Sequence, residues 1–113
     1  MSDKIALYKE GVKLKDAKEF DPAIAKLKEA AALDEKFTMP LHALTQVYTA
    51  MGRHEEAIAT AKKIVEIEPD DQFSYIALSR AYQPAGLIPE AEYAMMQGQQ
   101  AFARAQEIGR AHV

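Results

Sequence analysis

The chain has 113 residues, a net charge of −3, no cysteine, and apolar and charged contents of 49% and 27%. This composition is typical of one ordinary globular domain rather than of a disordered chain, and the absence of cysteine excludes a disulfide framework and thiolate chemistry. The eight lysines of residues 1–36 are matched by eight acidic residues, so the chain offers no basic surface for a nucleic-acid partner.

The N-terminal residues lead directly into a charged segment, without the apolar stretch of a signal peptide. No part of the sequence approaches the roughly 20 apolar residues that a membrane helix needs. Because cysteine is also absent, as is common in reducing compartments, we expect a cytoplasmic protein that does not insert into a membrane.

Apolar residues recur at helical spacing in segments separated by helix-ending residues. Gly52 and Gly86 should end helices in a left-handed conformation, and Pro69-Asp70-Asp71 should end one helix and cap the next. Asp21-Pro22 is expected to be an N-cap followed by proline at the first helical position. The pattern predicts six helices joined by short turns, over residues 3–16, 21–34, 38–51, 54–67, 72–84 and 88–110.

The fifth of these helices contains a proline near its end. Pro84 lacks the N–H that would reach Arg80, and it disfavours helical backbone at Gln83. This helix should therefore end early or kink, and the turn that follows it should be loosened.

The chain repeats itself with a period of 34 residues. Ala23, Ala57 and Ala91 are related by this offset, as are Gly52 and Gly86. One helix pair is too small to bury its own apolar face, so three pairs are expected to stack in register. The small residue at each alanine position would let the second helix of a pair approach the first closely.

The period and the residue types resemble those of the tetratricopeptide repeat, most clearly in residues 38–71. The chain departs from the pattern at Glu10, Glu35 and Gly98, where leucine, proline and alanine are usual. The resemblance implies an all-α, right-handed α-solenoid of three antiparallel helix pairs, forming a single domain over residues 1–113. Its repeats would be residues 4–37, 38–71 and 72–105, with a long last helix over about 88–110.

The resemblance also implies function, because the first helices of such repeats line a concave groove that binds peptides or helices of other proteins. The inward positions of the family fall here on Ile5, Tyr8, Val12, Lys15, Met39, His42, Gln46, Thr49, Phe73, Ile76, Arg80 and Gln83. We expect a non-catalytic interaction scaffold whose groove holds an apolar or amphipathic segment. Phe73, Ile76 and Tyr8 would be anchors, and Arg80 would meet a carboxylate or carbonyl. The alternative is that several of these residues only pack against neighbouring helices.

One class of these repeats grips the C-terminal carboxylate of heat-shock chaperones with Lys and Asn side chains. The corresponding places hold Tyr8, Val12, Ala43, Phe73 and Ala77 in this sequence. The resemblance therefore does not extend to a chaperone-tail receptor.

The last helix carries a stripe of mostly small residues, and no capping helix follows it in the sequence. One hypothesis is self-association, in which the protein is a self-assembling structural component that oligomerises through its groove and last helix. The alternative is that the first half of the helix packs on residues 72–84 and its end frays. The residues assigned to self-association are Met95, Met96, Phe102, Ala105 and Ile108.

The sequence contains no recognisable set of catalytic residues and implies no cofactor, so we do not expect an enzyme. His42, His54 and His112 fall on different elements without metal-ligand spacing, and His42 is interpreted as a polar groove residue rather than a pH-sensitive contact. The pairs Glu55-Glu56 and Asp70-Asp71 stand at helix starts, where acidic side chains stabilise the helix dipole. Neither Ser74 nor Ser79 has a base in a recognisable motif. These residues are therefore expected to be structural.

Overall fold

The computed structural model describes residues 3–111, with side chains to residue 108, and these residues form helices and turns without a strand. The helices are α1 (Lys4–Asp16), α2 (Phe20–Leu33), α3 (Met39–Ala50), α4 (His54–Ile67), α5 (Gln72–Tyr82) and α6 (Ile88–Ala111). The fold is thus the predicted all-α solenoid of three antiparallel helix pairs. All six predicted helices are present.

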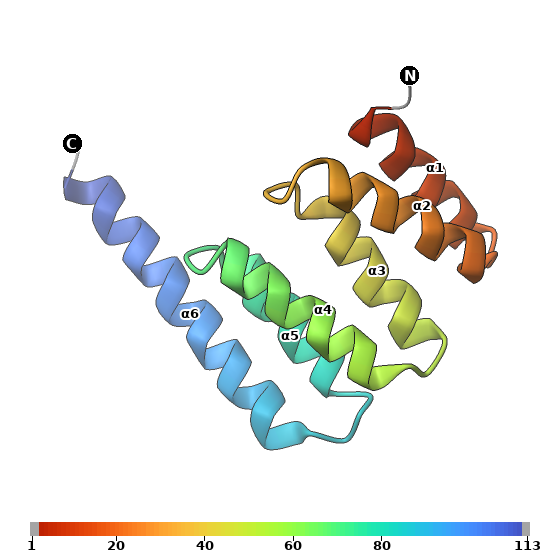
Figure 1. The fold of residues 1–113 in the computed structure, drawn as a ribbon. Coiled ribbons are helices and arrows are strands. Elements are labelled where there is room, and N and C mark those ends of the chain that lie inside the picture. Colours follow the sequence, from red (N-terminus) through yellow and green to blue (C-terminus); the bar gives the residue numbers. More distant parts are fainter. Residues whose placement is uncertain (1–2, 112–113) are drawn as a thin grey trace.

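The helices form two layers, with α1, α3 and α5 in one and α2, α4 and α6 in the other (Figure 1). The Cα atoms extend over 43 × 37 × 19 Å, so the molecule is a flat stack about two helices thick. The two ends of the stack are therefore α1 with α2 and α5 with α6, and α3 and α4 lie between them.

The same turn closes all three helix pairs. A residue with positive φ follows each first helix, namely Lys18 (62°), Gly52 (74°) and Gly86 (79°). The N–H of each donates to a carbonyl three residues earlier, and the next N–H donates to a carbonyl five residues earlier, as in Arg53 to Tyr48 at 2.8 Å. These are the two hydrogen bonds of a Schellman motif, in which the left-handed residue ends the helix. The prediction for Gly52 and Gly86 is confirmed, and the turn gives Lys18 the same conformation.

Two predicted details of the turns were wrong. Helix α2 begins at Phe20, and its N-cap residue Glu19 makes no side-chain capping bond, so Asp21-Pro22 lies inside the first turn. The start of α2 is set by the preceding Schellman motif rather than by a capping side chain. At Pro84, α5 does end early, at Tyr82, but Gln83 keeps helical dihedrals and the turn retains both of its hydrogen bonds.

The core follows the 34-residue period. Ala23, Ala57 and Ala91 are 0%, 0% and 3% exposed, which places the small residue where the two helices of each pair meet. The unusual Gly98 also has a packing reason, because a Cβ atom there would lie 3.1 Å from Cβ of Tyr75. Glycine at this position lets α6 approach α5 closely.

Candidate functional site

The first helices of the three pairs form the concave face, and a hollow of about 420 Å³ lies between α3 and α5. Its walls combine apolar and polar side chains. We call it the α3–α5 hollow. It is lined by His42, Thr45, Gln46, Thr49, Ala50, Phe73, Ile76, Ala77 and Arg80.

A second hollow of about 260 Å³, the α1–α3 hollow, lies on the other side of α3. His42 and Gln46 line both hollows, so α3 forms the ridge between them. Together the two hollows make the concave groove. The second is lined by Tyr8, Val12, Lys15, Met39, His42, Ala43 and Gln46.

The structure brings most of the predicted groove residues together and leaves two outside. Ile5, near the start of α1, lines neither hollow, and Gln83 turns back so that its Nε2 donates to Oγ of Ser79 at 3.3 Å. Four small wall residues were not among the predicted groove positions, namely Ala43, Thr45, Ala50 and Ala77. Each lies one turn from a predicted position, and Ala43 and Ala77 had been considered only as places of the carboxylate clamp. The other predicted residues, Tyr8, Val12, Lys15, Met39, His42, Gln46, Thr49, Phe73, Ile76 and Arg80, all line the groove.

Burial separates the groove residues that also pack from those that do not. Tyr8 and Val12 are half-buried against the core, and the Tyr8 ring meets Phe37 edge-on with centroids 5.8 Å apart. By contrast, Phe73 is 60% exposed and Met39 is 51% exposed. The packing alternative therefore accounts for part of the α1–α3 hollow, but not for the large apolar surface at Phe73.

The polar end of the groove carries two cations. Nζ of Lys15 donates to Oε1 of Gln46 at 2.7 Å, which links α1 to α3. Arg80 is exposed and forms no ion pair with any residue whose side chain the structure describes. Arg80 is thus available to an acidic or carbonyl group of a ligand. Between the hollows, burial lowers the pKa of His42, and the nearby carboxylates of Glu68 and Asp71 oppose this effect without reversing it.

The residues weighed for catalysis have structural partners. The Ser74 hydroxyl donates to the Glu68 carbonyl at 2.8 Å, and Asp71 accepts the Phe73 N–H at 3.0 Å as the N-cap of α5. Glu56 pairs with Arg53, and Asp70 with Arg104. Within the described residues no His, Cys, Asp and Glu side chains cluster as a metal site would require. His112 lies outside those residues.

The outer face of α6 is a second candidate surface. Met95 is 41% exposed and Phe102 is 45% exposed. The residues one and two periods before Met95 are Ala61 and Leu27, both completely buried where the next pair packs on the stack. Met95 is uncovered because, among the described residues, no helix packs on this side of α6. Met96, Ala105 and Ile108 are exposed as well, and the C-terminal part of α6 extends beyond the other helices (Figure 1).

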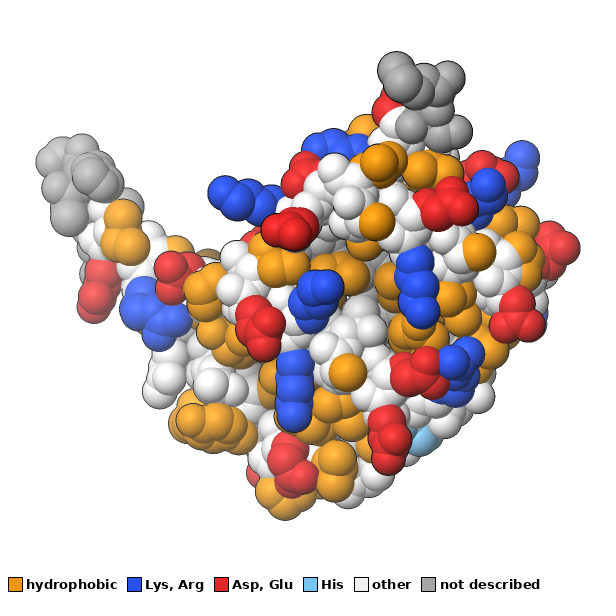
Figure 2. All heavy atoms as spheres, viewed as in Figure 1, with side chains coloured by type: hydrophobic (Ala, Val, Ile, Leu, Met, Phe, Trp, Pro, Cys, Tyr) orange, Lys and Arg blue, Asp and Glu red, His pale blue; other side chains and the backbone are white. Residues whose placement is uncertain are grey.

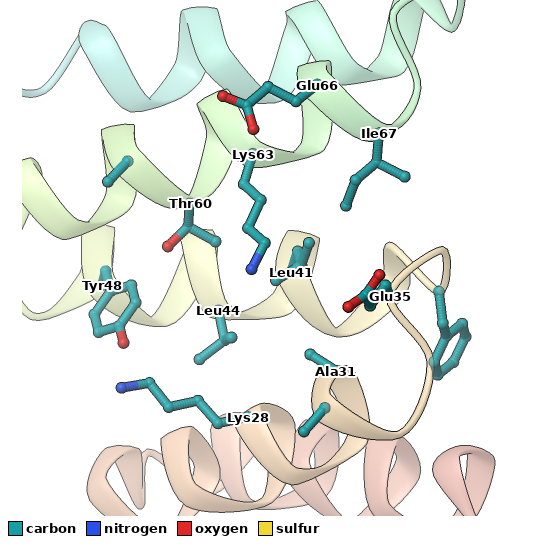
Figure 3. Close-up of a pocket in the computed structure, with 13 residues that line it drawn as sticks. Lys28, Ala31, Glu35, Leu41, Leu44, Tyr48, Thr60, Lys63, Glu66 and Ile67 are labelled. Carbon is teal, nitrogen blue, oxygen red and sulfur yellow. The ribbon is translucent and has the colours of Figure 1, made fainter.

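Sequence reasoning did not predict a further hollow, which lies on the opposite face of the stack between α2 and α4. Its volume is about 730 Å³, and the side chains that line it are shown in Figure 3. Figure 2 shows apolar surface on this face with both basic and acidic side chains among it, and the hollow is lined by Glu35 and Glu66 as well as by Lys28 and Lys63. The available signal was the run of alanines on α2 and Ala59 on α4, which are too small to close the space.

The helix and turn pattern agrees with comparisons to known proteins. The sequence model of the tetratricopeptide repeat matches residues 14–82, which is more than half of the chain. The chain therefore belongs to the tetratricopeptide repeat family, whose members serve as protein-interaction modules. No curated protein sequence matches it. Over the described residues, no helix is both long enough and apolar enough to cross a membrane.

Several solved structures share the fold. The crystal structure of MamA superposes with a TM-score of 0.81 at 27% identity, covering 93% of this chain and 61% of MamA. The Sgt2 repeat domain from Aspergillus fumigatus gives 0.80 at 23% identity, covering 88% and 66%. The Yersinia enterocolitica type III secretion translocator chaperone SycD, described as an alternative dimer, gives 0.79 at 16%, covering 96% and 83%. The chain spans about three fifths of the length of the MamA structures it matches.

Proposed function

We propose that the concave groove binds an apolar or amphipathic segment of another protein and that the chain acts as a non-catalytic scaffold. The observation that carries the proposal is the α3–α5 hollow. There the strongly exposed Phe73 and the half-buried Ile76 stand beside Arg80 on the same helix. An aromatic and an aliphatic anchor next to an available cation suit a segment with apolar residues and a nearby acidic group.

The test is selection of binding segments from a phage-displayed library of random 12-residue peptides. Enriched peptides are synthesised with a fluorescent label and titrated by anisotropy against the protein, Ile76→Asp and Phe73→Ala. We expect apolar peptides with at least one acidic residue, and a loss of affinity of about tenfold or more with Ile76→Asp. Arg80→Ala should weaken binding less and reduce its salt dependence.

The control is Leu33→Ala, which alters an exposed apolar residue of α2 outside the groove. Circular dichroism verifies that each variant keeps its helix content. Selected peptides whose affinity is unchanged by both Ile76→Asp and Phe73→Ala would contradict the proposal.

A second function is supported by the outer face of α6, and we propose self-association through it. Met95 and Phe102 together with Met96 provide apolar area, and Ala105 and Ile108 extend it along the protruding end of the helix. A structure of SycD, which has a similar fold, is described as a dimer, so a protein of this fold can self-associate.

Light scattering on a size-exclusion column tests self-association over a range of protein concentrations. We expect the mass to rise with concentration, and the Met95→Lys/Phe102→Lys variant to remain monomeric. Leu33→Lys is the control, since it places one lysine on an exposed apolar position of α2, away from α6. A mass equal to that of the monomer at every concentration would exclude this function.

A further inference from the structure

The exposed large apolar side chains of this protein gather on α6 and on the residue before it. Eleven such side chains are exposed among the described residues, and seven of them lie between Leu87 and Ile108. The other four are spread singly over α1, α2, α3 and α5. One helix at the edge of the stack (Figure 1) therefore carries most of the apolar surface that another molecule could cover.

Three of these side chains form a stripe along α6. Ile88, Met95 and Phe102 are seven residues apart and are 48%, 41% and 45% exposed. Because seven residues are nearly two turns of an α-helix, the three lie on one face over about 21 Å. Of the other described helices only α5 packs on α6, and it buries a different face, which contains Ala94 and Ala101. The stripe is therefore free along its whole length.

The C-terminal end of the stripe departs from the repeat. The residues one and two periods before Phe102 are Glu68 and Asp34, which end α4 and α2 as C-cap residues. Helix α6 instead continues through this position to Ala111. Residues 102–108 are all exposed, so this extension buries no side chain against the described part of the chain. The apolar Phe102 and Ile108 therefore have no packing role within the stack.

We propose that α6 pairs antiparallel with α6 of a second copy, about a twofold axis at Met95, and forms a closed dimer. This inference rests on the self-association proposed above, and it specifies the partner surface and its direction. Met95 lies opposite Met95 of the second copy. Ile88 lies opposite Phe102 of the second copy, because each is seven residues from the axis. Both copies thus contribute the same stripe, as a twofold contact requires.

The extension favours the antiparallel direction. In such a pair, the residues after Phe102 of one copy run past the start of α6 in the other, where Leu87 is 38% exposed. A parallel pair would bring the two extensions together and leave Leu87 uncovered. The stripe, Leu87 and Ile108 expose on the order of 500 Å² per copy, so pairing buries about 1,000 Å² in total, near the lower limit of a specific interface. A dimer of this size should dissociate reversibly.

The polar border of the stripe suits a partner that carries the same charges. The residues that follow the stripe positions by four are Glu92, Gln99 and Gln106, so two of the three are uncharged. In the antiparallel pair, Glu92 lies beside Gln99 of the second copy and not beside its Glu92. No like charges therefore meet along this border. The other charged side chains of α6 through residue 108 lie more than about 100° around the helix from the stripe, and they are Glu90, Arg104 and Glu107.

Disulfide cross-linking tests the direction, since the chain has no cysteine of its own. The Ile88→Cys and Phe102→Cys proteins are mixed in equal amounts in a glutathione redox buffer, and the linked peptides are identified by mass spectrometry. We expect the mixed 88–102 disulfide to exceed either homodisulfide by at least about tenfold, because a disulfide needs Cα atoms within about 7 Å. The two copies of position 102 would lie about 21 Å apart along the helices. Leu33→Cys, at an exposed site of α2, is the control and should link to neither.

A charge at position 99 tests the register. Lysine there would face Glu92 of the second copy twice in each dimer, so Gln99→Lys should lower the dimer dissociation constant by about threefold or more. Gln99→Glu should raise it by a similar factor, because like charges would then meet. Gln106→Lys is the matched control, since it adds the same charge to the same border and faces no carboxylate. Sedimentation equilibrium measures the three constants.

The mass in solution separates failure of this inference from failure of self-association. We expect the mass to rise with concentration and to level off at twice that of the monomer. A monomer at every concentration would overturn both proposals. Association that continues beyond a dimer, a dominant Phe102→Cys homodisulfide, or equal constants for Gln99→Lys and Gln99→Glu would each overturn the antiparallel pairing while leaving self-association in place.

Discussion

The two ends of the stack differ although their backbones follow the same repeat. On α1, Lys9, Glu10 and Lys13 are exposed. The residues one period later on α3 are Ala43, Leu44 and Val47, which are all buried by neighbouring helices. At the opposite end, α6 keeps the apolar Met95 and Phe102 on its outer face.

Because every helix pair in a repeat stack has the same backbone, the surface side chains of the end pairs determine whether a further helix can pack on them. Charged residues at the α1 end make burial under another helix costly, because each charge would lose its hydration. Apolar residues at the α6 end favour burial instead. We therefore expect the α1 end to resist packing by a further helix and the α6 end to favour it.

The largest effect, on the mass of the protein in solution, should come from making the α1 end resemble the interior of the stack. The variant Lys9→Ala/Glu10→Leu/Lys13→Val gives α1 the residues that α3 has one period later. We expect the two ends of different molecules to pack head to tail, which forms open chains because such a contact does not close on itself. Light scattering should show masses well above a dimer. Lys62→Ala is the control, because it makes the same change in net charge at an exposed site and should leave the mass unchanged. A triple variant whose mass is also unchanged would show that the charges on α1 do not prevent packing at this end.

The next largest effect, on stability, should come from the alanine contact that fixes the register of the two helices within each pair. Ala57 is completely buried between α3 and α4 in the middle of the stack, so Ala57→Leu should overpack this contact and reduce the free energy of unfolding by about 1–3 kcal/mol. Urea unfolding followed by circular dichroism measures the loss. Ala59→Leu on the exposed side of the same helix is the control, with an expected change of less than about 0.5 kcal/mol. Equal losses in both variants would show that the middle contact does not set the register.

A smaller effect distinguishes the turns of the two end pairs. Lys18 has the left-handed backbone that glycine provides at Gly86, and this conformation is unfavourable for a residue with a Cβ atom. Lys18→Gly should therefore stabilise the protein by about 0.5–1 kcal/mol, less than the full backbone strain because glycine also gains freedom in the unfolded chain. Thermal and urea unfolding measure the gain. Lys18→Ala removes the charge but not the strain, so a similar gain there would point to charge as the cause.

The smallest effect should be the pH dependence contributed by the half-buried His42 on α3, midway between the ends. Burial lowers its pKa below the usual 6.5, so between the folded and unfolded pKa values the unfolded chain binds more protons. The stability that the neutral imidazole contributes is therefore complete above about pH 6.5 and is lost as the pH falls below it. The slope of unfolding free energy between about pH 7 and pH 5 should be shallower in His42→Gln. Identical slopes would show that His42 does not titrate differently in the two states.

The sequence predicted the architecture well because the relevant signals are local or periodic. Helix positions follow from apolar spacing, two of the three turns from glycine, and the repeat from the alanines at one offset. The groove positions came from the family resemblance and fell on one face, apart from Ile5 and Gln83. Their role in binding stays a prediction. The start of α2 was wrong because the Schellman motif, rather than Asp21, determines it.

By itself, the sequence determined that this chain is a stack of three helix pairs, since helical periodicity and turn residues act within a few positions. It also contained the charges that close one end. Only the tertiary structure decided that α2 and α4 stand apart above α3, because the distance between two helices that never touch depends on how both pack against a third. It likewise decided that Lys18 adopts a left-handed backbone, since the required turn outweighs the preference of a single residue.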